Sequence, residues 1–280
     1  MSSSAAPLSV DAIRSTLETT ALGHPLYIYQ DLPSTNREAH TLAQNGAIHG
    51  TVVLAESQSA GYGRHGRPWF SPPGLNLYCS TIIRGMKFTP PLEQWLSWIP
   101  LISALAAVEA AQQVAAVSLT LKWPNDLLLS QRKVGGILCE SLFQAPHDTV
   151  IVIGIGLNVN VAPDAFPEDL RPIAASLSET TQQTIDRNRL VAQFLLELEQ
   201  CLDELRSHGS SRLRQAYIAR CATLGRRVQV QFADHDQVTG LAEGISTDGA
   251  LQIKPLSPHP RSQRMALLDV RAADVIHLRE

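Results

Sequence analysis

Three glycines and two arginines fall within the seven residues from Gly61 to Arg67, in the pattern Gly-x-Gly-Arg-x-Gly-Arg. Glycines let the backbone approach a ligand closely, and guanidinium groups hold phosphate or carboxylate oxygens in a fixed geometry. Two aromatic residues, Trp69 and Phe70, follow, although a solvated surface turn has little use for large aromatic side chains. The pattern therefore predicts a basic, mobile loop that folds over an anionic ligand.

The glycine spacing also matches the fingerprint of dinucleotide-binding proteins. In those proteins a helix starts at the glycines, and its N-terminus holds the pyrophosphate. Here Pro68, Pro72 and Pro73 follow at once and prevent a helix from starting. The sequence also lacks a Walker A pattern, a kinase catalytic loop and a nucleophile-elbow serine. We therefore reject the dinucleotide interpretation.

A second charged stretch follows the strand expected over residues 119–122. Lys122-Trp-Pro-Asn-Asp126 predicts a hairpin turn, and Lys133 begins the next strand, which carries Gly135 and Gly136. Asparagine and aspartate are common turn residues and alone would mean little. The chain has only four lysines, and two of them flank this turn, which favours a charged site.

Neutral polar residues mark two further places. Ser34-Thr35-Asn36 precedes a helical segment, so these side chains either cap the helix or bind a small polar ligand at its N-terminus. A buried strand expected over residues 150–160 ends in polar amides, Asn158 among them, and its Gly154-x-Gly156 is equally consistent with tight packing.

The elements that must position these residues divide the chain into three predicted parts. Residues 1–24 form an N-terminal extension with a helix-like piece from Val10 to Leu22, too short for a helix-turn-helix domain. Residues 25–222 form the main domain, with strands, a largely buried helix expected from Leu92 to Val117, and two further helices after Asp186. Residues 223–280 contain only short strands, including one over 265–268, and predict a small β-barrel.

Composition narrows the class of protein. The 280 residues are 44% hydrophobic and carry a net charge of -3, so the overall basic field of many nucleic-acid binders is missing. The four cysteines are far apart, which argues for reduced thiols in a cytoplasmic protein and against a zinc site. No apolar run reaches the ~20 residues that span a bilayer, and the first residues do not resemble a secretory signal.

Several of these motifs, in this order, resemble those of the biotin protein ligases, and the resemblance covers the chain from about Leu26 to its C-terminus. The matching motifs are Ser34-Thr35-Asn36, Gln58 with Gly61 to Trp69, Lys122-Trp-Pro-Asn-Asp126, Arg132-Lys133-x-Gly-Gly-Ile137, Gly154-x-Gly-x-Asn158 and the β-rich tail. The resemblance implies an α+β fold, with a mixed sheet and flanking helices as in class II aminoacyl-tRNA synthetases, followed by an SH3-like β-barrel. It also implies activation of biotin by ATP and Mg²⁺ as biotinoyl-AMP, and transfer of biotin to a lysine of a biotin carboxyl carrier domain.

The resemblance also implies roles for individual residues. Those assigned to biotin are Ser34, Thr35, Asn36, Gln58, Tyr62, Gly63, Arg64, Lys133 and Gly136. Those assigned to ATP are Arg67, Trp69, Lys122, Asn125 and Asn158. Arg64, Lys133 and Asp126 are the candidate catalytic residues; no direct metal ligand is assigned, and Asp126 is a candidate for an indirect Mg²⁺ contact.

One residue departs from the pattern: Tyr62 stands where the family often has arginine. Its effect stays open between looser retention of the adenylate and compensation by stacking. The expected protein is a monofunctional ligase, a monomer or weak homodimer, with neither DNA nor a membrane as partner. Two alternatives are a lipoate or octanoyl ligase on the same fold and a non-catalytic biotin or nucleotide sensor.

Overall fold

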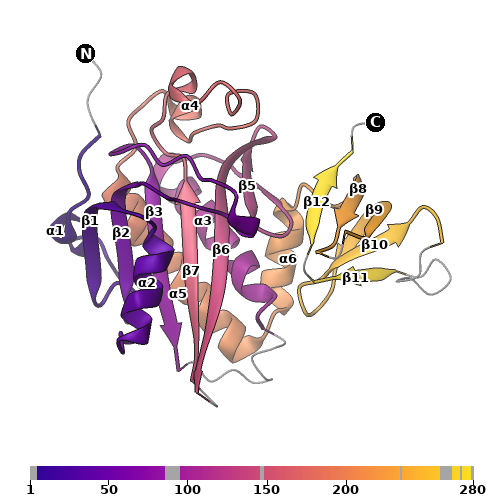
Figure 1. Ribbon diagram of the computed structural model, residues 1–280, viewed down its shortest axis with the longest axis horizontal. Helices are drawn as coiled ribbons and strands as arrows, with labels where there is room; N and C mark the ends of the chain where they lie inside the picture. Colours follow the sequence, from indigo (N-terminus) through magenta and orange to yellow (C-terminus); the bar gives the residue numbers. More distant parts are fainter. Residues whose placement is uncertain are drawn as a thin grey trace.

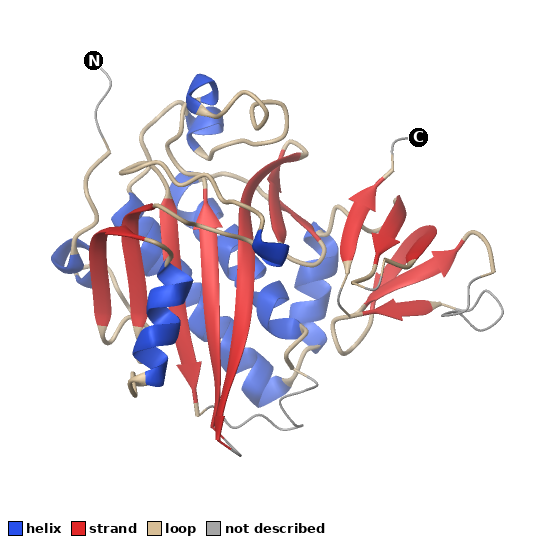
Figure 2. Ribbon diagram, in the orientation of Figure 1, coloured by secondary structure: helices blue, strands red, loops and turns tan. Residues whose placement is uncertain are grey.

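The computed structural model describes residues 5–85, 95–145, 148–233, 235–258, 267–271 and 273–278. Two β-sheets form its framework, and helices cover both faces of the larger one (Figures 1 and 2).

The larger sheet has seven strands in the order β1-β2-β3-β7-β6-β5-β4. Strands β1 and β2 are parallel and the other neighbours are antiparallel, so the predicted mixed sheet is confirmed. The central strands are largely buried because both faces are covered. The seven strands are β1 (Leu26–Leu32), β2 (Val52–Gln58), β3 (Leu77–Arg84), β4 (Thr120–Lys122), β5 (Asp126–Leu129), β6 (Arg132–Ala145) and β7 (Asp148–Leu157).

Helix α2 (Thr35–Gln44) packs on one face of this sheet, against β2, β3 and β7. Helices α3 (Trp98–Ala115), α5 (Arg187–His208) and α6 (Ser211–Arg220) lie behind the sheet in Figure 1. The side chain of Asp186 caps α5 by accepting the N–H groups of Asn188 and Arg189, as the sequence predicted. The length and apolar composition of α3 would also suit a membrane span, but 67% of it is buried inside the protein.

Helix α1 (Val10–Arg14) is much shorter than the segment predicted from Val10 to Leu22. The hydroxyl groups of Ser15 and Thr16 donate to backbone carbonyls of the preceding turn, and such bonds compete with helix continuation. The predicted length of this helical piece was therefore wrong.

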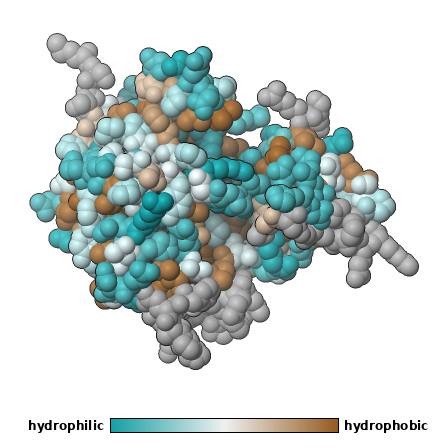
Figure 3. All heavy atoms as spheres, in the orientation of Figure 1, coloured by the Kyte–Doolittle hydropathy of each residue, from teal (hydrophilic) through white to brown (hydrophobic). Residues whose placement is uncertain are grey.

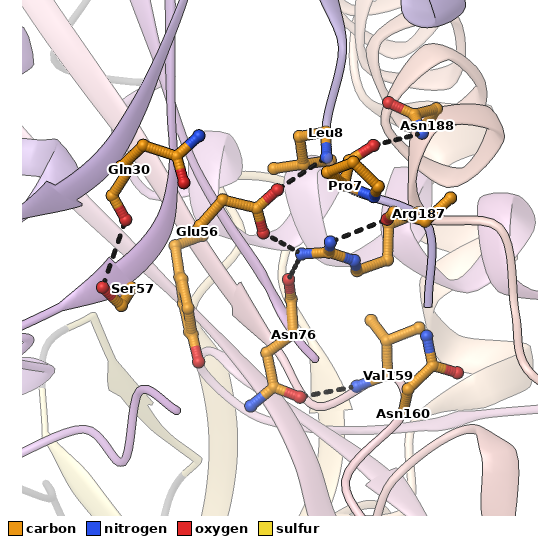
Figure 4. Close-up of polar contacts among 12 residues, drawn as sticks. Pro7, Leu8, Gln30, Glu56, Ser57, Asn76, Val159, Asn160, Arg187 and Asn188 are labelled. Atoms are coloured by element: carbon orange, nitrogen blue, oxygen red, sulfur yellow. Dashed lines mark hydrogen bonds and ion pairs between the residues drawn. The ribbon is translucent and has the colours of Figure 1, made fainter. Parts of the chain in front are cut away.

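A buried ion pair ties the segment before α1 to the sheet (Figure 4). Arg187 Nη1 lies 2.7 Å from Glu56 Oε2 and also donates to the carbonyl oxygen of Asn76. Arg187 Nη2 donates to the carbonyl oxygen of Ala6, and Glu56 Oε1 accepts the N–H of Leu8. Residues 6–8 therefore belong to the packed structure and complete the environment of a buried charge.

The smaller sheet lies beside the larger one, beyond α6 (Figure 1), and has five antiparallel strands in the order β11-β10-β9-β8-β12. The sheet is open, with β11 and β12 as its edges, so the predicted barrel closure is not found in the part of the chain that is described. The strands are β8 (Arg227–Gln231), β9 (Gln237–Ile245), β10 (Leu251–Pro255), β11 (Leu268–Val270) and β12 (Asp274–His277). Of the strand predicted over 265–268, residues 265 and 266 lie outside the described residues.

Candidate functional site

The glycine-arginine loop follows β2 and folds as a small hairpin. The N–H of Gly63 donates to the carbonyl oxygen of Arg67 at 2.8 Å, and the N–H of Trp69 donates to that of Gly61 at 2.9 Å. A 3-10 turn, Arg64–Gly66, forms the tip. Residues 61–76 are all described and contain no α-helix, so the decision against a dinucleotide fingerprint is confirmed.

A cavity of about 470 Å³ lies between this loop, the larger sheet and β12. Part of its wall is apolar and includes Phe70 and Phe166, whose ring centres are 5.9 Å apart. The predicted site residues that line the cavity are Tyr62, Gly63, Arg64, Arg67, Trp69, Lys122, Asn125, Asp126, Lys133, Gly136 and Asn158. The structure therefore brings the loop, the lysine-flanked turn and the end of β7 together around one cavity.

Lys133 lies at the centre of the charged wall. Its Nζ is 2.6 Å from Asp126 Oδ1 and 5.4 Å from the ring centre of Trp69. Lys122 is the cross-strand neighbour of Asp126 in the β4–β5 hairpin. Burial lowers the pKa of Lys122, and the charges of Lys133 and Arg67 act in the same direction. This is the geometry that the turn and its two flanking lysines predicted, and it concentrates positive charge on one wall.

Three basic side chains of the loop converge on Asp274 in β12. Arg64 Nη1 and His65 Nε2 each lie 3.3 Å from Asp274 Oδ1, and Arg67 Nη2 contacts Oδ2. Arg64 also donates to the carbonyl oxygen of Ala273 at 3.1 Å. Burial alone would raise the pKa of Asp274, but the two guanidinium groups and His65 hold it below its usual value. In this structure the smaller sheet thus supplies the anion that the loop cations contact.

We expect Asp274→Asn to release the loop from the smaller sheet, because a neutral amide cannot form ion pairs with the guanidinium groups of Arg64 and Arg67. Trypsin should then cleave after Arg64 several times faster than in the unchanged protein; the bond after Arg67 precedes Pro68 and resists trypsin in either case. Asp248→Asn is the matched control, since it breaks an ion pair with Arg271 that includes no residue of the loop. Equal cleavage rates in the Asp274 variant and the control would show that the contact does not hold the loop.

Ser34, Thr35, Asn36 and Gln58 do not line the cavity. Ser34 is the N-cap residue of α2 but makes no side-chain cap hydrogen bond, so the capping interpretation is wrong for its hydroxyl group. The N–H and hydroxyl of Thr35 donate to Gln58 Oε1, at 2.9 and 3.3 Å. Ser34, Thr35 and Asn36 are buried at the N-terminus of α2, and Gln58, hydrogen-bonded to Thr35, is half-buried.

The two glycines of β7 make room for side chains of the site. A Cβ atom at Gly154 would lie 2.1 Å from Asn36 Oδ1, and one at Gly156 would lie 2.6 Å from Trp69 Nε1. The Gly-x-Gly pattern therefore reflects close packing against two predicted ligand-binding residues. Asn158, at the end of the same strand, donates to the carbonyl oxygen of Ala175 and accepts from Asn76, so much of its amide is already hydrogen-bonded.

Sequence reasoning missed two acidic residues, Glu140 and Asp274. Glu140 Oε2 accepts from Asn36 at 2.7 Å, Tyr62 at 3.1 Å and His40 at 3.2 Å. A charged residue within an apolar strand was a usable signal for Glu140. Asp274 gave no local signal, because its contacts join residues about two hundred positions apart in the chain.

Within the described ranges, no group of three or more His, Cys, Asp or Glu side chains is placed to hold a metal ion. The cavity lining combines cations of the loop and of β4 and β6 with apolar and aromatic walls.

Comparison with known proteins identifies the class of protein to which this chain is similar. Residues 27–158 match the biotin/lipoate A/B protein ligase family, and residues 223–278 match the biotin protein ligase C-terminal domain. The chain is 34% identical to the biotin--[acetyl-CoA-carboxylase] ligase of Mycobacterium tuberculosis, over 98% of this chain and 97% of that protein. It is also 34% identical to the bifunctional ligase/repressor BirA of Bacillus subtilis, over 88% of this chain and 74% of that protein.

Solved structures agree on the fold. The biotin protein ligase of Aquifex aeolicus in complex with biotin and ATP superposes with a TM-score of 0.75 at 24% identity, covering 90% of this chain and 99% of that one. The Leishmania major enzyme in complex with biotinyl-5-AMP gives 0.59 at 21% identity, covering 88% and 98%. This chain belongs to the biotin protein ligase family.

Proposed function

We propose that this chain joins biotin to a lysine of a biotin carboxyl carrier protein, with ATP as the activating substrate and biotinoyl-AMP as the intermediate. The observation that carries the proposal is the convergence of Arg64, Lys122 and Lys133 on one cavity that also has apolar walls. Cations suit the carboxylate and the phosphates, and apolar walls suit the rest of a small ligand. A protein that only bound biotin would have no need of phosphate-directed cations.

Electrostatics explains the first step. The biotin carboxylate must attack the α-phosphorus of a polyanion, and this forms a mixed anhydride and releases pyrophosphate. We assign Arg64 and Lys133 to the carboxylate and the α-phosphate, where preorganised positive charge offsets the repulsion. The loop aligns the two reactants and keeps water from the anhydride. In the second step a neutral lysine amine of the carrier attacks the anhydride carbonyl and AMP leaves.

Trp69, Arg67, Lys122, Asn125 and Asn158 are assigned to ATP. The donor set fits Mg²⁺ that enters bound to the phosphates, because Asp126 offers the oxygen atoms that this ion prefers. Asp126 Oδ1 is already paired with Lys133, so we assign Asp126 an indirect contact. Mg²⁺ would supply further neutralisation of phosphate charge.

Pyrophosphate release on mixing the protein with biotin and MgATP tests the proposal. We expect release with biotin and transfer of labelled biotin to a carrier domain, and no comparable transfer with lipoate. Labelling by lipoate alone would favour the lipoate or octanoyl ligase, and binding of biotin without release would favour a sensor.

We propose that the smaller sheet is SH3-like. We also propose that it forms the outer wall of the site, because the cavity lining includes Gln231, Asp274, Val275 and Ile276. We also propose a cytoplasmic monomer or weak homodimer that does not bind DNA. The free cysteines support the compartment, and Figure 3 shows hydrophobic residues on this face only in small groups.

A further inference from the structure

Glu140 receives hydrogen bonds from elements that are far apart in the sequence. Asn36 and His40 come from α2, Tyr62 comes from the glycine-arginine loop, and Glu140 itself lies on β6. The hydrogen bond from His40 is the main cause that lowers the pKa of Glu140, and the donors Asn36 and Tyr62 act the same way against burial. The carboxylate is thus held in its charged form as a common acceptor.

This carboxylate sets the orientation of the Asn36 amide. A charged carboxylate only accepts hydrogen bonds, so the NH₂ group of Asn36 must face Glu140 and its Oδ1 must point away. That oxygen accepts the hydroxyl of Ser80 at 2.6 Å, in the space that Gly154 leaves free. The NH₂ group also donates to the carbonyl oxygen of Leu138, but at 3.4 Å against 2.7 Å to Glu140, so Glu140 provides the shorter, charge-assisted bond of the two that set the orientation.

The hydrogen bonds continue from Ser80 back to the loop. Ser80 Oγ lies 2.8 Å from Thr35 Oγ1, and Thr35 donates to Gln58. Gln58 Nε2 donates to Ser71 Oγ at 3.2 Å, and Ser71 donates to the carbonyl oxygen of Trp69 at 3.0 Å. A connected set of polar groups therefore begins at Tyr62 and ends at Trp69, the two ends of the loop hairpin.

We infer that Glu140 is a positioning residue for adenylation, which fixes the Asn36 amide for recognition of the biotin rings and anchors the loop through Tyr62. The inference rests on the proposed function and deepens it. It also answers why tyrosine can stand at position 62: that position has to provide a donor to Glu140, and the phenol hydroxyl provides one. The Tyr62 ring is further held by Arg37, whose guanidinium carbon lies 5.3 Å from the ring centre.

Separate measurement of the two substrates tests the inference in the full-length protein. Glu140→Ala should raise the KM for biotin about tenfold, because it leaves the NH₂ group of the buried Asn36 amide with only its longer bond to the Leu138 carbonyl oxygen, and should change the KM for ATP less than twofold. Glu140→Gln keeps one acceptor oxygen and should recover most of the biotin affinity. Tyr62→Phe removes only the loop bond to Glu140, so it should speed escape of the biotinoyl adenylate several-fold.

Glu38→Ala is the matched control. Glu38 lies on α2, as Asn36 does. Like Glu140 it accepts a tyrosine hydroxyl, that of Tyr29 at 3.0 Å, but it lies outside this set of polar groups. The control should leave both KM values unchanged. Equal changes in the two KM values for Glu140→Ala, or a lower melting temperature with unchanged kinetics, would reduce Glu140 to a structural residue and overturn the inference.

Misfolding of Glu140→Ala and failure of the proposed function can each be told apart from failure of the inference. If Glu140→Ala does not fold, Glu140→Gln and Tyr62→Phe decide, and wild-type behaviour in both would overturn the inference. Failure of the proposed function is a different result, because the unchanged protein would then release no pyrophosphate with biotin and MgATP.

Discussion

Lys133→Ala should slow formation of biotinoyl-AMP by about a hundredfold or more. Removal of one electrostatic contact in a closed site typically costs about 3 kcal/mol of transition-state stabilisation, and each 1.36 kcal/mol is about tenfold in rate. Here the loss is compounded, because Asp126 would keep its negative charge without the partner that now lies 2.6 Å away. That unpaired carboxylate would repel the incoming phosphates.

Pyrophosphate release at saturating biotin and MgATP measures this effect. Lys254→Ala is the matched control, since Lys254 lies in the smaller sheet with its Nζ 3.7 Å from Glu243. Lys133→Arg should recover little, because a planar guanidinium group cannot take the place of a compact ammonium group beside Trp69. A rate for Lys133→Ala within threefold of the control would show that the anion site lies elsewhere.

The local parts of the site could be predicted from the sequence because their chemistry is contiguous. The loop from Gly61 to Trp69 and the turn from Lys122 to Asp126 each carry their glycines, cations and turn residues within a few positions. Their meeting at one cavity depends on the observed strand order, in which β3 and β7 lie between β2 and β6, and no local pattern specifies that order.

The contacts made by Glu140 and Asp274 could not be predicted in the same way. Each joins elements that only tertiary packing brings together: Asp274 meets the loop through the smaller sheet, and Glu140 meets Asn36 across β6 and α2. The open edges of the smaller sheet were missed for a related reason, because alternation along short strands does not specify whether the first and last strands pair. Propensity likewise overestimated α1, where hydroxyl groups compete for backbone carbonyls.

Arg187 shows how far the stability of the fold depends on a residue that contacts no proposed ligand. Its side chain is fully buried, and its contacts connect Glu56 on β2, the carbonyl oxygen of Asn76 and the N-terminal segment (Figure 4). We expect Arg187→Ala to lower the free energy of unfolding by about 3 to 5 kcal/mol, because removal of one partner leaves the Glu56 carboxylate buried and unpaired.

Urea unfolding followed by circular dichroism measures that change. Arg206→Ala is the matched control on the same helix: Arg206 pairs with Asp203 three residues earlier, but its side chain is 50% exposed, so the change should stay within about 0.5 kcal/mol. The double variant Glu56→Gln with Arg187→Ala should recover part of the loss, because the buried negative charge is then gone. If the double variant is instead less stable than Arg187→Ala by the full cost of Glu56→Gln alone, the two side chains act independently and the loss in Arg187→Ala comes from packing.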